Sequence, residues 1–319
     1  MKVNPAALIA VTAALGCAGA SAHALRLPAA PRCPVFPASN PWNQRVDRLR
    51  VAKSSAAIIA SIGPGTGLHA DFGSGLWQGS PIGFPFDVVG RSTPRSRVSF
   101  EYADESDRVG YPIPRHAHIE GGSDHHALLV DRNACRLYEL GALERRNGRW
   151  HAWAGATWSL RSNRLRPPGW TSADAAGLPI FPGLARYDEV RRGVINHALR
   201  FTVERTRRAY VYPARHYASN LTDPSLPPMG LRVRLTASFD VRPFPRQARI
   251  VLVALKRYGM LVADNGADWY ITGAPNRGWS NDQLHTLGRV KGSDFEVVDT
   301  SKLTSVTVTN LQQLLHSRP

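Results

Sequence analysis

The densest group of side chains that could do chemistry lies between residues 101 and 126. It combines carboxylates with imidazoles: Glu101, Asp104, Glu105, Asp107, His116, His118, Glu120, Asp124, His125 and His126. Cleavage of a glycosidic bond needs two carboxyl groups, one to protonate the leaving oxygen and one to activate water or attack the sugar. The sequence therefore predicts Glu101, Asp104 and Glu105 as catalytic candidates. Partners from distant strands would be Asp71, Asp131, Asp188 or Asp264, and we take Asp264 as the catalytic candidate among them.

A second constellation would suit elimination from a uronate sugar. That reaction needs a His or Tyr base and a cationic or amide group that neutralises the sugar carboxylate. The candidates are His216 as a catalytic residue, with Tyr212, Arg215 and Asn265 in substrate binding. The chain also contains 8 Trp and 9 Tyr, whose flat rings can stack on pyranose faces. Hydrolysis and elimination both stay open.

His116, His118 and Glu120 could hold a metal ion. On an extended segment, side-chain alternation places all three on one face, and imidazole and carboxylate groups are metal ligands. The segment fits the opening of a cupin motif, but the Glu follows too closely and no second half of the motif is found. We therefore expect a solvated, His-rich loop there, and no metal or other cofactor.

Several sharper catalytic signatures do not occur in the sequence. It has no GxSxG, no GxxxxGK, no HExxH and no dinucleotide-binding GxGxxG followed by an acidic residue. A serine or cysteine hydrolase, a phosphate-loop enzyme, a nicotinamide enzyme and a zincin are therefore not expected.

The elements that must position these residues are mostly strands. Short runs rich in β-branched and aromatic residues, bounded by Gly, Pro, Asn or Asp, dominate the chain after residue 66. They predict strands at 86–89, 97–103, 127–131, 135–140, 150–160, 199–203, 209–213, 231–241, 260–264 and 269–272. We expect a mainly β fold, all-β with a few peripheral helices, as a β-sandwich or jelly-roll-like single domain.

Alternation assigns faces within two of these strands. In 97–103 the apolar residues alternate with Glu101, which places this carboxylate opposite the buried face. In 231–241 they alternate with Arg232 and Arg234, which predicts a half-buried sheet with a cationic outer face. Arg232 is accordingly a candidate for substrate binding.

Helical patterns are fewer. They fall at 172–175, 187–192, 245–258, 281–287 and 309–316. The segment 245–258 is apolar almost all round and is followed by Gly259, a typical C-terminal cap, so this helix is expected to be largely buried.

The N-terminus has the pattern of an export signal. Lys2 precedes a short apolar run, 5–15, and a site of small residues follows near Ala22. We expect a signal peptide at 1–22, an extended arm at 23–45 and a single mainly β domain at 46–319, in a secreted or periplasmic protein. The run is too short to cross a bilayer and no later stretch is longer, so no transmembrane segment is expected.

The three cysteines separate into one that lies in the signal and two that remain. The residues before Cys17 form a poor lipobox, so lipid anchoring through Cys17 is not expected. Cys33 and Cys135 stay together in an oxidising compartment, which predicts a disulfide between them.

The chain is strongly basic. Its 40 Lys and Arg against 24 Asp and Glu give a net charge of +16, nearly all of it from arginine. Such a field attracts anionic polymers. No basic patch is interleaved with aromatic residues in a recognisable module, so nucleic acid is not an expected partner.

Three stretches resemble a group of secreted bacterial proteins of unknown activity. They run from Cys33 to Asn43, from Thr171 to Val190 and from Tyr258 to Gly273. The resemblance implies one domain that contains both Cys33 and Cys135, and it brings no catalytic residues.

Two functions follow as expectations. The first is a secreted enzyme acting on a glycan, either a glycoside hydrolase with paired carboxylates or a polysaccharide lyase. The second is a non-enzymatic protein that binds an anionic envelope polymer through the face carrying Arg232 and Arg234.

Overall fold

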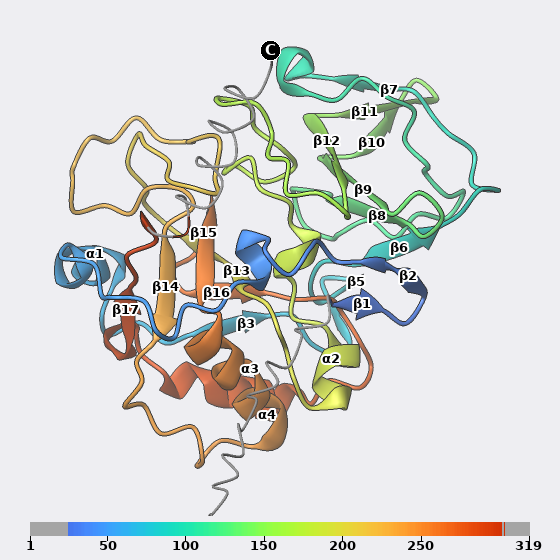
Figure 1. Ribbon diagram of the computed structural model, residues 1–319. Helices are drawn as coiled ribbons and strands as arrows, with labels where there is room; N and C mark the ends of the chain where they lie inside the picture. The colour runs from blue at the N-terminus through green and yellow to red at the C-terminus, as the bar shows by residue number, and fades with distance from the viewer. Residues whose placement is uncertain (1–24, 302, 304–319) are drawn as a thin grey trace, which may run out of the picture.

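A computed structural model describes residues 25–301 and 303 of the chain. The predicted mainly β class is confirmed, because strands gathered in several sheets outweigh a few helices (Figure 1). The predicted signal peptide and the predicted helix at 309–316 lie outside the described residues. No helix in the described part of the chain is both long enough and apolar enough to cross a membrane.

The strands are short. They are β1 (Arg26–Leu27), β2 (Ala30–Pro34), β3 (His69–Asp71), β4 (Leu76–Trp77), β5 (Ser80–Pro81), β6 (Phe86–Val89), β7 (Val98–Phe100), β8 (Ala127–Asp131), β9 (Arg136–Gly141), β10 (Glu144–Arg146), β11 (Arg149–Ala152), β12 (Ala154–Ser159), β13 (Leu199–Val203), β14 (Arg232–Leu235), β15 (Met260–Asn265), β16 (Tyr270–Thr272) and β17 (Phe295–Val297).

The α-helices are α1 (Ser55–Ile62), α2 (Tyr187–Arg192), α3 (Arg246–Arg257) and α4 (Asn281–His285). Single turns of 3-10 helix are η1 (Pro41–Asn43), η2 (Ala103–Glu105), η3 (Phe181–Gly183), η4 (Thr286–Arg289) and η5 (Gly292–Asp294).

Two sheets carry most of the structure. One has six strands in the order β17-β14-β15-β13-β16-β3, and α3 and α4 lie below it in Figure 1. The other has four strands in the order β12-β9-β8-β6 and lies at the upper right. Both sheets are mixed, because β13 pairs with β15, β16 with β3 and β6 with β8 in parallel. The candidate site lies where the two sheets approach each other.

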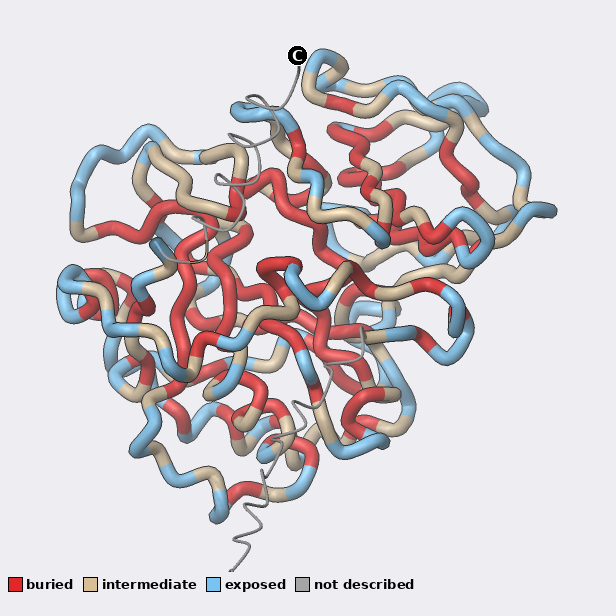
Figure 2. The backbone as a smooth tube through the Cα atoms, viewed as in Figure 1, coloured by how far each residue is buried: buried red, intermediate tan, exposed pale blue. Residues whose placement is uncertain are grey.

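A single large core joins the two sheets, and its buried chain runs through the middle of the molecule in Figure 2. Strand β8 is buried along its whole length. Leu128 and Val130 belong to the large core, whereas Ala127 and Leu129 belong to a smaller core on the other face. Burial on both faces explains why the residues before Asp131 in this strand form an uninterrupted apolar run, 127–130.

The predicted helix at 245–258 is present as α3, following Pro245 and ending before Gly259, whose φ is 66°. Proline fits the start of a helix because it has no N–H to leave unbonded, and glycine tolerates the left-handed backbone that follows. The prediction of burial holds for one face only, because Arg246 and Arg249 lie exposed on the other.

The disulfide between Cys33 and Cys135 is confirmed, with the two Cα atoms 5.1 Å apart. It ties β2 to the chain just before β9. The predicted extended arm is folded where it is described: β1 and β2 form a hairpin, and Trp42 is buried in the large core. The N-terminal segment is therefore part of the body of the protein.

The predicted cationic outer face of β14 is wrong. Arg232 and Arg234 are only 2% and 8% exposed. The Arg232 guanidinium donates to the carbonyl oxygens of Pro41, Gln44 and Tyr258, and Arg234 forms an ion pair with Glu296. Alternation of apolar and polar residues distinguishes the two faces of a strand. It does not show whether another chain segment, here the one with Pro41 and Gln44, covers the polar face. These arginines bind that covering segment instead of facing solvent.

Two predicted elements do not form. Residues 172–175 make a turn in which the Ser172 hydroxyl donates to the carbonyl oxygen of Leu178. Serine hydroxyls compete with helical hydrogen bonds in this way. Residues 209–213 contribute only an isolated bridge between Tyr210 and Met229. The helix α1 was not predicted.

Candidate functional site

A cavity of about 440 Å³ opens where β15, the segment before β8 and the turn at 172–177 meet. Its polar and aromatic lining residues are Tyr102, Glu105, Asp124, His126, Trp153, Thr171, Ser172, Asp174, His216, Asp264 and Asn265. We call it the acid cavity. Four sequence candidates meet there, because Glu105, His216, Asp264 and Asn265 all line it.

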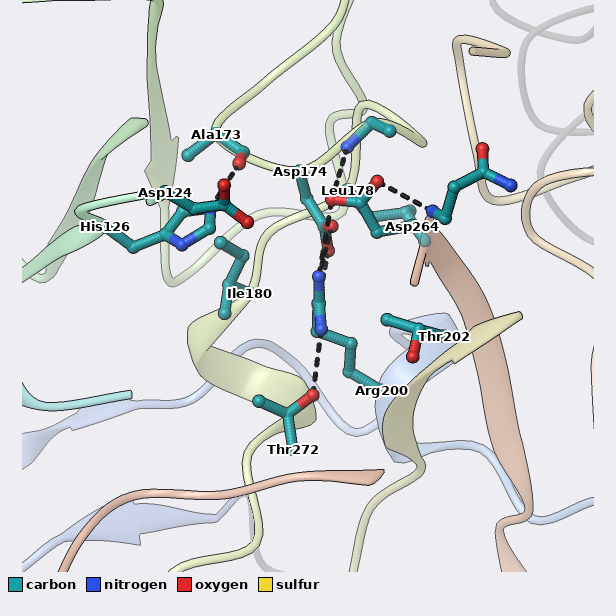
Figure 3. Close-up of polar contacts among 12 residues, drawn as sticks. Asp124, His126, Ala173, Asp174, Leu178, Ile180, Arg200, Thr202, Asp264 and Thr272 are labelled. Atoms are coloured by element: carbon teal, nitrogen blue, oxygen red, sulfur yellow. Dashed lines mark hydrogen bonds and ion pairs between the residues drawn. The ribbon is translucent and has the colours of Figure 1, made fainter. Parts of the chain in front are cut away.

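A buried ion pair between Arg200 and Asp174 lies next to the acid cavity, which Asp174 lines (Figure 3). Arg200, on β13, donates from Nε and Nη2 to the two oxygens of Asp174, each at 2.8 Å, and from Nη1 to Thr272 at 2.8 Å. Both partners of the pair are buried. Bidentate pairing of this kind fixes geometry, so the Asp174 carboxylate is held rigidly next to the cavity.

Asp264 lies beside this pair at the end of β15 (Figure 3). Its Oδ1 accepts from its neighbour's backbone, the N–H of Asn265, at 2.8 Å, and its Oδ2 is 3.5 Å from Arg200 Nη2. Burial, followed by the negative charge of Asp174, raises the pKa of Asp264 to about 7. Near neutral pH Asp264 is therefore a carboxyl group that can donate a proton.

His216 presents an imidazole to the same cavity. Its Nδ1 lies 2.8 Å from the carbonyl oxygen of Ala175. Because a carbonyl oxygen only accepts, Nδ1 donates this hydrogen bond, which leaves Nε2 as the ring nitrogen that can accept a proton. The ring also stacks on Tyr217 at 5.7 Å between centroids. This arrangement suits a general base of fixed tautomer.

His126 has a different role, because both of its ring nitrogens are engaged. Nδ1 pairs with Glu120, and Nε2 lies 2.8 Å from the carbonyl oxygen of Ala173. Burial disfavours the charged ring, but the hydrogen bond and charge of Glu120 prevail and raise the pKa of His126 to about 9. His126 is therefore an imidazolium that holds the 172–177 turn, not a base.

Glu139, on β9, holds the same segment further along. Its carboxyl oxygens accept from the N–H groups of Ile180 at 2.9 Å and Phe181 at 2.8 Å. Burial raises the pKa of Glu139 to about 8. The segment that carries Asp174 is thus anchored at both ends by buried side chains.

Two exposed aromatic residues stand at the rim of the acid cavity. Tyr102 is 51% exposed and Trp153 is 44% exposed. The N–H of Tyr102 donates to the carbonyl oxygen of Trp153 at 2.9 Å, which holds the two residues side by side. Flat, exposed rings beside polar groups are a suitable platform for a sugar.

The other sequence candidates lie outside the acid cavity or have their polar atoms engaged elsewhere. Glu101 and Asp104 are exposed and do not line it, and Asp104 pairs with Arg108. Arg215 also lies outside, with its Nε donating to the carbonyl oxygen of Arg166. Tyr212 lies outside at a cis peptide bond with Pro213, and Arg232 is a buried residue of β14.

Two candidates within the cavity already have partners. Glu105 accepts from the N–H of Thr171 at 2.8 Å. The Asn265 amide donates to the carbonyl oxygen of Glu204 at 3.1 Å and accepts from Thr206 at 3.2 Å. Both side chains shape the cavity through these contacts.

The three residues considered as metal ligands have separate surroundings. His118 pairs with Asp87 at 2.7 Å, Glu120 pairs with His126, and His116 is exposed. Among residues 25–301 and 303, no three His, Cys, Asp or Glu side chains gather as a metal site.

Sequence reasoning missed Asp174 and Arg200, and it gave His126 no role beyond its place in the polar stretch 101–126. The pattern at 172–175 predicts a helix that contains Asp174, and the pattern at 199–203 predicts only a strand for Arg200. The available signal was a charged residue inside an apolar strand, 199–203, because a buried charge is costly unless it is paired and hydrogen-bonded. Searches of protein-family models, curated proteins and solved structures find no match to this chain.

Proposed function

We propose that this protein cleaves a glycosidic bond in a glycan outside the cytoplasm, with Asp264 as general acid and His216 as general base. The observation that carries the proposal is their convergence: a carboxyl group with a raised pKa and an imidazole with a free Nε2 line one cavity. Carboxyl groups whose environments separate their charge states commonly mark acid and base roles. The exposed rings of Tyr102 and Trp153 would hold the sugar.

The chemistry divides between the two residues. Asp264 gives its proton to the leaving glycosidic oxygen, and the resulting carboxylate is stabilised by Arg200, 3.5 Å away. His216 Nε2 takes a proton either from water, which then attacks the sugar, or from the carbon beside a uronate carboxylate. The first route is hydrolysis and the second is elimination, and they yield different products. In both routes Asp174 holds the Arg200 guanidinium in place through its two hydrogen bonds.

The compartment supports this proposal. The N-terminal pattern is typical of an export signal, and the disulfide between Cys33 and Cys135 suits an oxidising environment. The binding-only alternative has less support, because it depended on an exposed face at Arg232 and Arg234 and both are buried.

A panel of neutral and acidic polysaccharides tests the proposal. Reducing ends report hydrolysis, and the absorbance of unsaturated products reports elimination. Asp264→Asn and His216→Gln should each lower turnover by about 10² to 10⁴ while the protein stays folded. Asp223→Asn, in an exposed loop outside the cavity, is the matched control and should keep full activity. Full activity in Asp264→Asn would contradict the assignment of the acid.

The same assay tests the sequence-based hypothesis on Glu101. If Glu101 belongs to a catalytic pair, Glu101→Gln should lose activity as severely as Asp264→Asn. We expect a change of less than severalfold, because Glu101 is exposed and lies outside the acid cavity.

A further inference from the structure

A second cavity, of about 550 Å³, lies across the Glu120–His126 ion pair from the acid cavity. Glu120 lines the second cavity and His126 lines the first, and no lining residue is common to both. We call the second one the aromatic cavity. It plays no part in the chemistry proposed above.

The aromatic cavity is built on the edge of the six-stranded sheet. His69 on the edge strand β3 lies opposite Tyr270 on β16, and their rings stack at 4.1 Å between centroids. Asp71 is two residues further along β3, so alternation places its carboxylate on the same side as His69. The stacked rings therefore form a flat wall with a carboxylate next to it.

The hairpin of β4 and β5 supplies another side of the aromatic cavity. It carries Trp77, which is 63% exposed. The base of the hairpin is fixed, because the Asn281 side chain accepts from the N–H of Ser74 and donates to its carbonyl oxygen, both at 2.9 Å. Gly121 packs against its other end, where an added Cβ would meet the Ser80 Cβ at 2.3 Å. The indole of Trp77 is thus exposed, and the β4–β5 hairpin that carries it is fixed by these contacts.

The charge of the aromatic cavity is opposite to that of the whole protein. Its lining includes the carboxylates of Asp71 and Glu120 and no Lys or Arg. Within the described residues, Asp71 forms no ion pair and no side-chain hydrogen bond, and Glu120 uses only Oε2 toward His126. Burial lowers the pKa of His69, which keeps that ring uncharged near neutral pH. A cationic ligand would meet free carboxylate oxygens there.

We propose that the aromatic cavity binds an amino sugar that carries a free ammonium group. The pyranose face would stack on Trp77 or on the wall formed by His69 and Tyr270, and the ammonium would pair with Asp71 and Glu120. Stacking accounts for the exposed rings. The ammonium accounts for Asp71, which has no ion-pair partner among the described residues, and for the Glu120 oxygen that does not face His126. The inference does not rest on the proposed function, because it uses different residues.

Calorimetric titration with a glucosamine trisaccharide tests this site. We choose about pH 6, where the sugar ammonium is charged, and about 0.15 M salt, where charges more than about 8 Å away are screened. The intact protein should bind this probe at least tenfold more tightly than the N-acetylated trisaccharide. Equal binding of the two sugars, or binding of neither, would overturn the proposal.

Variants locate the binding. Asp71→Asn and Trp77→Ala should each weaken it by about tenfold, and Trp77→Ala keeps the fold testable because its side chain is exposed. Trp153→Ala, at the rim of the acid cavity, is the matched control and should leave this binding unchanged. Loss of binding in Trp153→Ala, with Trp77→Ala unaffected, would place the amino sugar in the acid cavity and reject the aromatic cavity. Loss of glycan cleavage in Asp264→Asn reports separately on the proposed function.

Discussion

Asp174 and Asp264 are the same chemical group in two different environments. Asp174 receives two short hydrogen bonds from Arg200, whereas Asp264 has only a contact of 3.5 Å to the same guanidinium. One guanidinium can form a bidentate pair with only one carboxylate at a time. Asp264, the second carboxylate, therefore lies close to Arg200 but makes only a long contact with it. The fold thereby produces a proton donor from an ordinary aspartate, at the cost of some stability when that group ionises.

The pH dependence of stability tests this difference directly. The folded-state pKa of Asp264 is about 7, above the ordinary aspartate value of 3.8. The folded protein therefore holds a proton that the unfolded chain releases between about pH 4 and pH 7, and stability should fall as pH rises through this window. Asp264→Asn should remove that part of the slope and be at least as stable as the wild type near pH 8. Urea unfolding at several pH values measures it. Asp104→Asn, an exposed carboxylate, is the control, and an equal slope in all three proteins would contradict the raised pKa.

Local patterns were sufficient to predict most of the elements. The run at 127–131 is β8 and the run at 199–203 is β13, because short buried strands are dense in β-branched and aliphatic residues. Their pairing was not predictable, since the parallel pairs β13 with β15 and β16 with β3 depend on contacts between distant segments. The acid cavity depends on the same pairing, so Asp264 and His216 could be named singly but not placed together.

The covering segment of β14 was unpredictable for a related reason. A buried arginine bound to carbonyl oxygens has the same sequence pattern as an exposed one. Only the fold brings Pro41 and Gln44 within reach of Arg232. The missed helix α1, which packs against β17, is a different case, because Ser54 before its short apolar run, 55–62, and Gly63 after it are typical boundary residues of a helix.

The disulfide gives a prediction for the N-terminal element. It closes a loop of 102 residues and joins the β1–β2 hairpin to the four-stranded sheet. Replacing both Cys33 and Cys135 by Ser should lower the free energy of unfolding by up to about 4 to 5 kcal/mol in the chain-entropy description. Thermal unfolding measures the loss, and glycan cleavage below the new midpoint should change little because neither sulfur lines the acid cavity. Unchanged stability in the double variant would show that packing of Trp42 alone secures the segment.

Not all of the positive charges behind the net charge of +16 are accessible at the surface of the molecule. Arg166, Arg186, Arg200 and Arg234 are buried in ion pairs and cannot meet a polymer. Other arginines line a groove beside α2 and α3, where Arg246, Arg249 and Arg257 surround partly exposed apolar side chains. These three have no carboxylate partner among the ion pairs of the described residues. We therefore predict that any attraction of polyanions comes from this groove and not from β14.

Salt dependence tests this assignment at the scale of the whole molecule. Binding to an acidic polysaccharide releases counterions for each charge neutralised, so affinity should fall steeply between about 50 mM and 200 mM salt. Replacing Arg246, Arg249 and Arg257 together by Gln should flatten that slope. The matched control replaces Arg145, Arg146 and Arg149, which are exposed on the β10–β11 hairpin far from α3 in Figure 1. If both triple variants flatten the slope equally, the attraction belongs to the overall field and not to the groove. If the wild-type affinity is insensitive to salt, Coulombic attraction does not organise binding at all.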